Sequence, residues 1–488
     1  MSDICIIYSR KDSSIVRQLV SLLKGTDWTV WWDENISTGD WERSVRKAIG
    51  ESRVLVAVVS PNTEGSDVFR DELLLAKKKG KSIFPFVIND ADLPLGFGFF
   101  HRTDAFGWSG KNDTHFKSLA GKLSSELGNS SPTRPSSLVI RGKTIRLPAC
   151  VFSLSSFETR LDPRAGIELL GLATPAAGLL SAYDTYAWRE DRNFARSIEA
   201  FRASSSVLVL DSGNYEAFRL NDRFDSTAAL EGWKKEKNLS GWKRDSFIET
   251  ATTMSPDLAF SFDDPDPKGT ASEIADTVIA NTRMDEDGID SRDFPICPIV
   301  HLPHGSKTPL PTLASQIICR VANGLDPIMI AVPERELGNG ILERARTIRE
   351  IRRSLNALGK YYPLHILGTG NPLSMLVLSA VGADSFDGLE WCRTVADWDE
   401  WRLHHLQHFD FFARGELGRL PVGLRKLAEN KEAPYELRAS CYNLAAFQHW
   451  VKEIQDRVGT TGLGELMELH VPGIGRRLLK ELHGEFNE

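Results

Sequence analysis

Short apolar runs alternate with amphipathic stretches along the first part of the chain. Residues 4–8, 54–59 and 83–88 are apolar almost without interruption, which is typical of strands buried on both faces of a parallel sheet. Residues 13–24 instead carry apolar side chains at helical spacing, and Gly25 follows as a helix-ending residue. This alternation predicts a small doubly wound α/β domain, whose functional groups gather beyond the carboxyl ends of its strands.

A polar stretch rich in Pro and Ser begins at Gly128 and predicts a linker. After it, repeated βα units over about 260 residues predict a (β/α)8-type barrel, whose active site collects the carboxyl ends of the strands. Beyond residue 415 the pattern becomes mainly helical. Six barrel strands are expected to end at or near Asp211, Asp263, His301, Pro333, Gly368 and Asp387. The predicted domains are residues 1–127, a linker at 128–147, a barrel at 148–415 and a helical region at 416–488.

Composition adds limits on the class of protein. A chain of 488 residues exceeds the roughly 250–300 residues of a single core, so two or three domains are expected. No apolar run approaches the roughly 20 residues that span a bilayer, and no basic leader precedes the first strand, which favours the cytoplasm and no membrane partner. The six cysteines are scattered without a CxxC pair, so neither a disulfide framework nor a zinc ribbon is expected. With a net charge of −7, any binding of nucleic acid needs a local basic patch.

Short motifs follow the predicted strands of the first domain in order. Tyr-Ser-Arg at 8–10 closes the first strand, and Trp-Trp-Asp at 31–33 follows the second. A loop with Gly-Asp comes next at 35–40, and Ser-Pro-Asn at 60–62 precedes a helix that opens with Phe-Arg-Asp-Glu at 69–72. In this combination nearly the whole first domain resembles a bacterial-type TIR domain, which implies a flavodoxin-like fold.

The resemblance implies that this domain either assembles with other TIR domains or cleaves NAD+. In the NAD-cleaving members a glutamate on this helix is catalytic, and Glu72 holds the matching position. Breaking the nicotinamide–ribose bond develops oxocarbenium character that a carboxylate stabilises, and nicotinamide leaves as a neutral molecule, so no general acid is required. By the same resemblance Arg10, Asp33 and Phe69 lie beside the cofactor, and the 35–40 loop forms a rim or a self-assembly surface. The alternative is that Glu72 is only a helix N-terminal acid favoured by the helix dipole.

A second ordered set of motifs lies along the predicted barrel. From residues 211, 262, 299, 368, 385 and 443 onward the motifs are Asp-Ser-Gly-Asn-Tyr, Phe-Asp-Asp, Ile-Val-His, Gly-Thr-Gly-Asn-Pro, Ser-Phe-Asp and Asn-Leu-Ala-Ala-Phe-Gln. The set resembles tRNA-guanine transglycosylases over roughly residues 148–455. The version Asp-Gly-Leu-Glu-Trp-Cys-Arg at 387–393 is more similar to the branch that inserts 7-deazapurines into DNA.

This second resemblance implies a role for each of five residues. Asp387 is the expected nucleophile at C1′ of the target nucleoside, and Asp211 is the acid/base that moves the proton. Tyr215 stacks on the base and Asp263 accepts hydrogen bonds from its Watson–Crick edge, a combination that suits a purine. His301 stands where the family has glutamine, so base recognition is expected to differ. An open alternative is that the barrel keeps this pocket to sense a nucleobase without turnover.

The family's structural zinc site is missing from the sequence. Its CxCxxC motif has no counterpart, so no zinc is expected. Because the zinc region supports nucleic-acid binding in the family, its loss argues against tRNA and favours DNA.

The end of the chain adds a candidate contact for nucleic acid. Residues 471–480 are Val-Pro-Gly-Ile-Gly-Arg-Arg-Leu-Leu-Lys, which resembles a helix-hairpin-helix element within 466–482. Backbone amides at a helix N-terminus bind phosphate, and basic side chains add affinity that falls with salt. The candidate residues are Gly473, Gly475, Arg476, Arg477 and Lys480. The alternative is a helical hairpin that only packs against the barrel.

Together these features predict a bacterial anti-phage defence protein. In this hypothesis the TIR domains form a homo-oligomer and hydrolyse or cyclise NAD+ under the control of a barrel that recognises a nucleobase or nucleic acid. One alternative makes the barrel a transglycosylase that exchanges a base in DNA or RNA, with the TIR domain as an assembly module. Another is a TIR scaffold with a ligand-sensing barrel and no enzymatic activity.

Overall fold

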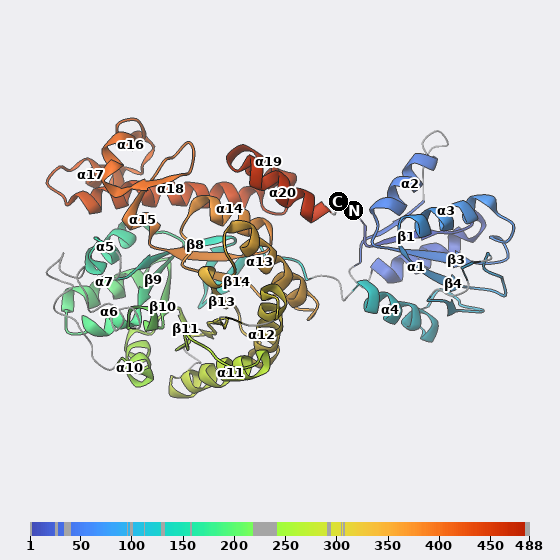
Figure 1. Cartoon of the computed structure of the whole chain (residues 1–488), viewed down its shortest axis with the longest axis horizontal. Coiled ribbons are helices and arrows are strands. Elements are labelled where there is room, and N and C mark those ends of the chain that lie inside the picture. The colour runs from blue at the N-terminus through green and yellow to red at the C-terminus, as the bar shows by residue number, and fades with distance from the viewer. Residues whose placement is uncertain are drawn as a thin grey trace. The chain divides into compact units, whose positions relative to one another are not determined.

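The computed structural model divides the chain into two compact units, Met1–Pro132 and Thr133–Glu488 (Figure 1). It describes residues 2–24, 28–33, 41–94, 96–97, 101–111, 113–127, 132–156, 159–217, 242–289, 294–303, 305 and 308–483, except the side chains of residues 24, 41, 125, 414 and 479–483. The 35–40 loop and residues 128–131 of the expected linker lie outside this description. Each unit has hydrophobic core clusters of its own.

The first unit is built on a parallel sheet with the strand order β2-β1-β3-β4-β5. Its elements are β1 (Ile4–Ile7), the 3-10 helix η1 (Arg10–Asp12), α1 (Ser13–Lys24), β2 (Val30–Trp32), α2 (Trp41–Glu51), β3 (Val54–Val59), α3 (Asp67–Lys78), β4 (Ser82–Val87), β5 (Thr103–Asp104) and α4 (Thr114–Leu127). One core cluster contains Leu19 of α1 and Leu119 of α4, and another contains Ile49 of α2 and Leu73 of α3. Helices therefore cover both faces of the sheet, and the predicted doubly wound fold is confirmed.

The second unit contains a nearly closed barrel of eight parallel strands. These are β8 (Ala149–Leu154), β9 (Ala177–Ser181), β10 (Val207–Asp211), β11 (Leu258–Phe260), β12 (Ile296–Cys297), β13 (Ile330–Pro333), β14 (Leu364–Leu367) and β15 (Ser385–Gly388). Their order in the sheet, β12-β11-β10-β9-β8-β15-β14-β13, follows the chain once around. A parallel bridge between Ile299 and Ala331 crosses the gap between β12 and β13, where Val300 N–H donates to Ala331 O at 2.8 Å. The predicted (β/α)8-type barrel is confirmed, and its carboxyl strand ends meet at one mouth.

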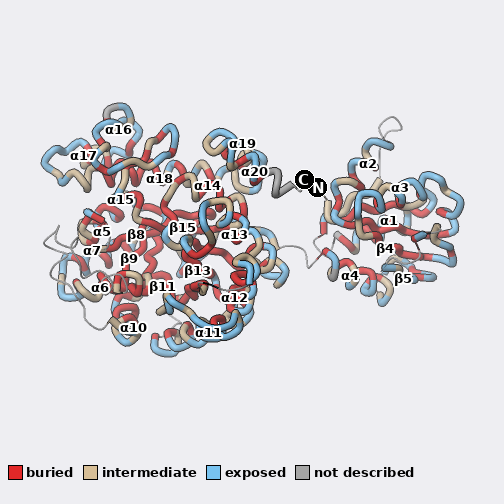
Figure 2. Tube along the Cα trace, in the orientation of Figure 1, coloured by how far each residue is buried: buried red, intermediate tan, exposed pale blue. Residues whose placement is uncertain are grey.

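Helices surround this barrel. They are α5 (Pro163–Ala173), α6 (Ala182–Ala187), α7 (Arg192–Ala203), α10 (Arg244–Met254), α11 (Ala271–Gly288), α12 (Leu310–Leu325), α13 (Ile341–Asn356) and α14 (Pro372–Ala380). In α13, Ala345, Ile348 and Leu355 are buried and Arg353 is exposed, as expected for an outer helix with a solvated basic face. Figure 2 shows that the other helices also have one buried and one exposed side. The barrel strands are almost wholly buried, whereas the surrounding helices alternate between buried and exposed residues.

A β-hairpin formed by β6 (Ser137–Ile140) and β7 (Lys143–Arg146) packs against the amino ends of the barrel strands. Arg141 and Gly142 connect its strands with φ angles of 48° and 79°, as a two-residue turn of type I′ requires. Ile140 and Ile145 join the core cluster inside the barrel and Leu138 packs against it, whereas Val139 is exposed. Much of the linker expected at 128–147 is thus folded, because the apolar residues alternate on either side of the Arg-Gly turn and bury one face.

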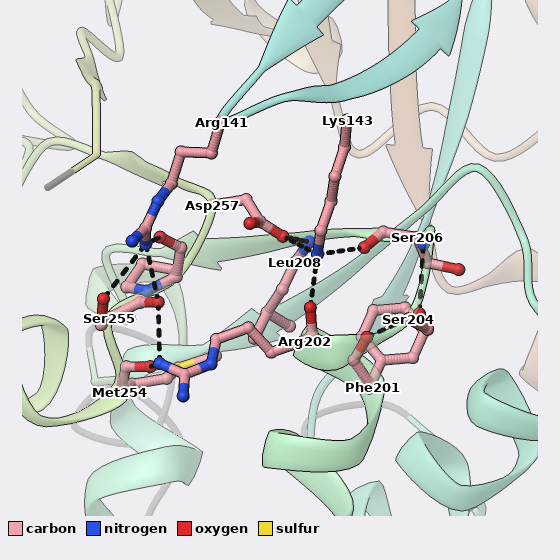
Figure 3. A network of polar contacts seen from close by, with 11 residues as sticks. Arg141, Lys143, Phe201, Arg202, Ser204, Ser206, Leu208, Met254, Ser255 and Asp257 are labelled. Atoms are coloured by element: carbon pink, nitrogen blue, oxygen red, sulfur yellow. Dashed lines mark hydrogen bonds and ion pairs between the residues drawn. The ribbon is translucent and has the colours of Figure 1, made fainter.

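Basic side chains tie this hairpin to the barrel (Figure 3). Lys143 Nζ donates to Asp257 Oδ2 at 2.7 Å and to Ser206 O at 2.8 Å. The same Asp257 oxygen accepts from Leu208 N–H at 2.8 Å. Arg141 donates to backbone oxygens just before β11. The Asp257 carboxylate is buried, and it therefore joins the hairpin to the amino end of β10.

Arg134 anchors the chain ahead of the hairpin. Its Nε lies 2.8 Å from Oδ1 of Asp384, whose side chain is completely buried. Asp384 directly precedes β15. The segment 133–147 is therefore attached at the amino ends of the two strands that carry Asp211 and Asp387.

The C-terminal region is mainly helical, as predicted. Its elements are α15 (Glu390–Arg393), β16 (Thr394–Ala396), β17 (Leu403–His405), α16 (Phe409–Glu416), α17 (Val422–Glu429), α18 (Tyr435–Arg457), α19 (Thr461–His470) and α20 (Pro472–His483). Asn443 of α18 donates through Nδ2 to Trp391 O at 2.8 Å and accepts from Ala396 N–H at 3.0 Å, which holds this long helix on the barrel. Within the described ranges, no helix has the length and apolar character that crossing a membrane requires.

Candidate functional site

A cavity of about 290 Å³ opens at the mouth of the barrel. Asp211 ends β10 and Asp387 lies in β15, whereas Asp263 and His301 lie in the segments that follow β11 and β12. Because parallel strands present their carboxyl ends at one mouth, residues far apart in the sequence meet here. The cavity wall contains all five residues singled out from the barrel sequence, namely Asp211, Tyr215, Asp263, His301 and Asp387.

Asp387 has a fixed orientation in this wall. Ser153 Oγ donates to its Oδ2 at 2.7 Å, and Gly368 N–H donates to its Oδ1 at 2.8 Å. His365 Nε2 lies 3.3 Å from the same Oδ1, while His365 Nδ1 lies 2.9 Å from Ser385 Oγ. The sequence analysis missed Ser153 and His365. The available signal was a polar residue within an otherwise apolar strand, as in β8 and β14.

His301 lies between two carboxylates. Its Nε2 is 2.7 Å from Asp263 Oδ2, and its Nδ1 is 2.8 Å from Oε1 of Glu336, in the 3-10 helix η2 (Glu334–Glu336) after β13. Burial opposes a charge on the ring, but the two carboxylates outweigh it and raise the pKa of His301 to about 10. The imidazolium donates both N–H groups to protein atoms and has none left for a ligand. Sequence analysis missed Glu336, because a short turn after a strand has no periodic pattern.

Asp263 and Asp211 have opposite protonation behaviour. Burial alone would raise the pKa of Asp263, but the hydrogen bond and charge of His301 lower it, and Asn214 Nδ2 also donates to Oδ1 at 3.0 Å. For Asp211, burial and the negative charges of Glu216, Asp263 and Asp387 raise the pKa well above its usual value. The cavity therefore pairs an ionised Asp263 with an Asp211 that keeps its proton to a higher pH, a separation that permits different chemical roles.

Glu216 is a further acidic residue of the wall that the sequence analysis missed. Ser155 Oγ donates to its Oε1 at 2.6 Å, and burial raises its pKa in spite of this hydrogen bond. Its sequence signal was its place directly after Tyr215. The Asp-Ser-Gly-Asn-Tyr motif thus extends by one residue.

The more exposed part of the wall is basic. The guanidinium of Arg335 lies 5.1 Å from the centroid of the Tyr215 ring, a distance that permits a cation–π contact. Arg344 and Arg393 also line the cavity, each in an ion pair with a glutamate. The wall thus combines buried acids with arginines nearer to solvent that are themselves paired with glutamates. Among the described residues, no group of three or more His, Cys, Asp and Glu side chains is arranged to hold a metal ion.

The first unit has a cleft of about 390 Å³, within the range of about 300–1,000 Å³ that is usual for small-molecule sites. Its wall contains the four residues expected beside NAD+, namely Arg10, Asp33, Phe69 and Glu72. Phe69 and Glu72 come from α3, which begins after Ser66, whose hydroxyl accepts from Phe69 N–H at 3.3 Å. Arg10 and Asp33 follow β1 and β2, which are neighbours in the sheet.

In this cleft Arg10 and Asp33 form an ion pair, whereas Glu72 has no such partner among the described residues. Arg10 Nη2 lies 3.1 Å from Asp33 Oδ2, and Tyr8 O–H donates to Asp33 O at 2.5 Å. Glu72 is half-buried, and no hydrogen bond or ion pair joins its side chain to a residue in the described part of the chain. Burial and the negative charge of Asp33 raise the pKa of Glu72 to about 7. Near neutral pH, Glu72 is therefore divided between its protonated and ionised forms.

The C-terminal motif forms two packed helices, α19 and α20. A Cβ atom at Gly475 would lie 2.9 Å from Met467 O, so the close approach of the two helices depends on this glycine. Met467 and Leu478 are buried in the main core cluster of the unit. Gly473, Arg476 and Arg477 are exposed, and the side chain of Lys480 lies outside the described residues. The apolar side of the motif thus packs onto the second unit, while phosphate binding by its basic side stays a prediction.

Comparison with known proteins bears on the first unit. No curated protein matches the chain. The likeness of the barrel to transglycosylases therefore stays a prediction from its motifs and its cavity. The family model described as TIR domain matches residues 4–120. The chain thus carries a TIR domain, and a nearly closed parallel barrel follows it.

Proposed function

We propose that the TIR domain cleaves NAD+ with Glu72 as its catalytic residue, under the control of the barrel. The observation that carries this proposal is the Glu72 carboxyl group, which faces a cleft and has no partner among the described residues. Loss of nicotinamide develops positive charge on the ribose, and an ionised Glu72 beside it stabilises that charge. Arg10 is the proposed contact for the anionic pyrophosphate, and Phe69 contributes apolar wall.

The barrel is the proposed sensor in this scheme. Its cavity offers the Tyr215 ring, Asp263 with its lowered pKa and Asp211 with its raised pKa, which suit the flat face and the hydrogen-bonding edge of a purine. Exposed Arg476 and Arg477 support contact with a phosphate backbone, with DNA favoured over tRNA. The proposed setting is anti-phage defence in the bacterial cytoplasm, where binding to the barrel promotes a homo-oligomer of TIR domains.

The test is an NAD+ cleavage assay on the purified full chain. NAD+ loss is followed by chromatography, alone and with guanine, deoxyguanosine, single- and double-stranded DNA, and tRNA as separate probes. We expect one probe to stimulate cleavage, and Glu72→Ala to lower the rate about 100-fold or more. Glu42→Ala removes an exposed glutamate of the same unit and serves as the matched control. No NAD+ loss under any condition, or loss unaffected by Glu72→Ala, contradicts the proposal.

A second candidate function is base exchange by the barrel itself. It is favoured by the presence in one cavity of Asp387 and of Asp211 with its raised pKa, as a nucleophile and a proton donor require. This function predicts that labelled guanine or 7-deazaguanine enters DNA or tRNA. Incorporation should disappear in Asp387→Ala and persist in Glu72→Ala. Absence of label in every nucleic acid would leave the barrel as a sensor.

A further inference from the structure

We propose that Glu72 carries a proton in the empty cleft and releases it to solvent when the positively charged nicotinamide ring of NAD+ binds. Asp33 is, in this proposal, a positioning residue that keeps the proton on Glu72 until then. The inference rests on the proposed NAD+ cleavage and adds to it the event that charges the catalytic carboxyl group.

The cleft contains two carboxyl groups but only one basic side chain in its described wall. That cation, Arg10, is paired with Asp33, and its side chain is 66% exposed whereas that of Asp33 is 13% exposed. Glu72 has neither a hydrogen bond nor an ion pair within the described residues. With the one cation paired to Asp33, the negative charge of Asp33 disfavours ionisation of the unpaired Glu72, which therefore holds a proton to a higher pH.

The other groups around Glu72 do not supply a compensating charge. Burial first and the charge of Glu72 second raise the pKa of the Cys5 thiol in β1, which stays neutral. Lys81 acts on Cys5 in the opposite direction, but its ammonium donates to Ser52 O and is not among the causes that set the pKa of Glu72. From α2 the cleft receives the apolar Val45. The raised pKa of Glu72, about 7, agrees with this arrangement and has burial first and Asp33 second as its causes.

Binding of NAD+ changes this balance through one positive charge. An opposite charge within about 4–6 Å lowers the pKa of a carboxyl group by about 1–3 units, which is enough to ionise Glu72 at neutral pH. The proton goes to solvent. As the glycosidic bond breaks, its electron pair leaves with nicotinamide, and the positive charge moves from the ring to the ribose. Glu72 therefore faces a cation throughout the step. In hydrolysis, water then attacks C1′ to give ADP-ribose, and Glu72 takes up the proton that this water loses.

The test uses carbocyclic NAD+, in which a methylene group replaces the ring oxygen of the nicotinamide ribose, so that the ring charge is kept but cleavage is blocked. Calorimetric titration of the full chain at pH 7 in phosphate and in Tris measures the protons released on binding. We expect about half a proton per site, because a group with a pKa near 7 is half-protonated there. The reduced, uncharged form of the same analogue is the matched ligand and should release none.

Variants test whether the proton released on binding comes from Glu72. Glu72→Gln should abolish proton release, and Asp33→Asn should reduce it because Glu72 is then already ionised. Asp33→Asn should also shift the acidic limb of the pH profile of NAD+ cleavage to lower pH, which a merely structural role would not do. Asp90→Asn, at an exposed position of the same unit, is the control and should change neither the proton release on binding nor the pH profile of NAD+ cleavage.

The possible results separate this inference from the function on which it rests. If the oxidised and reduced analogues release equal numbers of protons, or if release persists in Glu72→Gln, the inference is wrong while the NAD+ site stands. If neither analogue binds, the proposed function itself is contradicted. The comparison of the two ligands on the unmodified chain decides the point even if Asp33→Asn fails to fold.

Discussion

Nε2 of His301 lies 2.7 Å from Oδ2 of Asp263, and the side chains are only 6% and 7% exposed. His301 forms a second ion pair on its other side, where Nδ1 lies 2.8 Å from Oε1 of Glu336. A histidine whose pKa rises from 6.5 to about 10 on folding stabilises the fold fully below about pH 6.5. That contribution is lost as the pH rises towards 10.

We therefore expect His301→Gln to destabilise the second unit most strongly near pH 6. Glutamine is neutral and leaves buried carboxylates without their cation, which costs about 3–5 kcal/mol. The loss should shrink between pH 7 and 10, where the unmodified protein also gives up its imidazolium. The test is the urea concentration at the midpoint of unfolding, measured at pH 6, 8 and 9.5 by hydrogen exchange of peptides that contain β12, in the variant and in the unmodified protein. His405→Gln, at an exposed position of β17, is the control, and a penalty independent of pH would contradict the charged state of His301.

Asp211→Asn should have the opposite effect and stabilise the second unit at neutral pH. An acid whose pKa is raised on folding costs stability above its usual pKa, because the unfolded chain ionises freely while the folded chain does not. Near pH 4 the variant and the unmodified protein should have the same free energy of unfolding. As the pH rises above 4, that of the variant should exceed that of the unmodified protein by up to about 1.4 kcal/mol per pH unit, until Asp211 also ionises in the folded protein. Thermal unfolding at pH 4, 6 and 7.5 measures the difference, and a destabilised variant at pH 7.5 would overturn the assignment.

Mutations on the two sides of the C-terminal helical hairpin (α19 and α20) should affect different properties, namely stability on the apolar side and DNA binding on the basic side. Leu478→Ala removes a buried side chain and should cost about 2–5 kcal/mol, seen as faster hydrogen exchange in α19 and α20. The double variant Arg476→Ala, Arg477→Ala leaves this packing intact. If the hairpin binds a phosphate backbone, this variant should weaken DNA binding and flatten its salt dependence. Unchanged DNA binding would make the hairpin a packing element only.

The sequence predicted the parts of the fold whose pattern is long and periodic. Both α/β units were visible in it because parallel strands are continuous apolar runs, and Asp211 and Asp263 were visible because each follows such a run. Asp387 follows no such run and was recognised by its Ser-Phe-Asp motif. Glu336 and His365 were not, since their importance depends on which side chain the neighbouring strand or the loop after it places beside them. His301 was noticed as an unusual residue, but its place between two carboxylates needed the three-dimensional structure.

The hairpin at 137–146 was missed for a different reason. The Pro and Ser residues just before it are typical of a linker, and they concealed the alternating pattern on either side of the Arg-Gly turn. Its partners, Asp257 and Asp384, are remote in sequence from Lys143 and Arg134. No local pattern indicates such pairings.

These pairings decide where the chain can be divided. A protein that begins at Thr133 keeps Arg134 and Lys143, and we expect it to fold. One that begins at Pro148 leaves the buried Asp257 without its cation Lys143, and such an uncompensated charge costs about 3–5 kcal/mol. Asp384 loses Arg134 in that chain but keeps its ion pair with Arg352, so it adds less to the penalty. Thermal unfolding of the two truncated chains tests this, and equal stability would show that neither contact matters.

The same attachment determines how tension on the chain reaches the barrel. A pull on the residues ahead of Thr133 acts on Asp384 and, through Lys143, on Asp257, and so on the amino ends of β15 and β10. The cavity is lined by Asp211 and Asp387 of the same two strands, at their carboxyl ends, so a pull at one end of these strands acts on the elements that shape the cavity at the other.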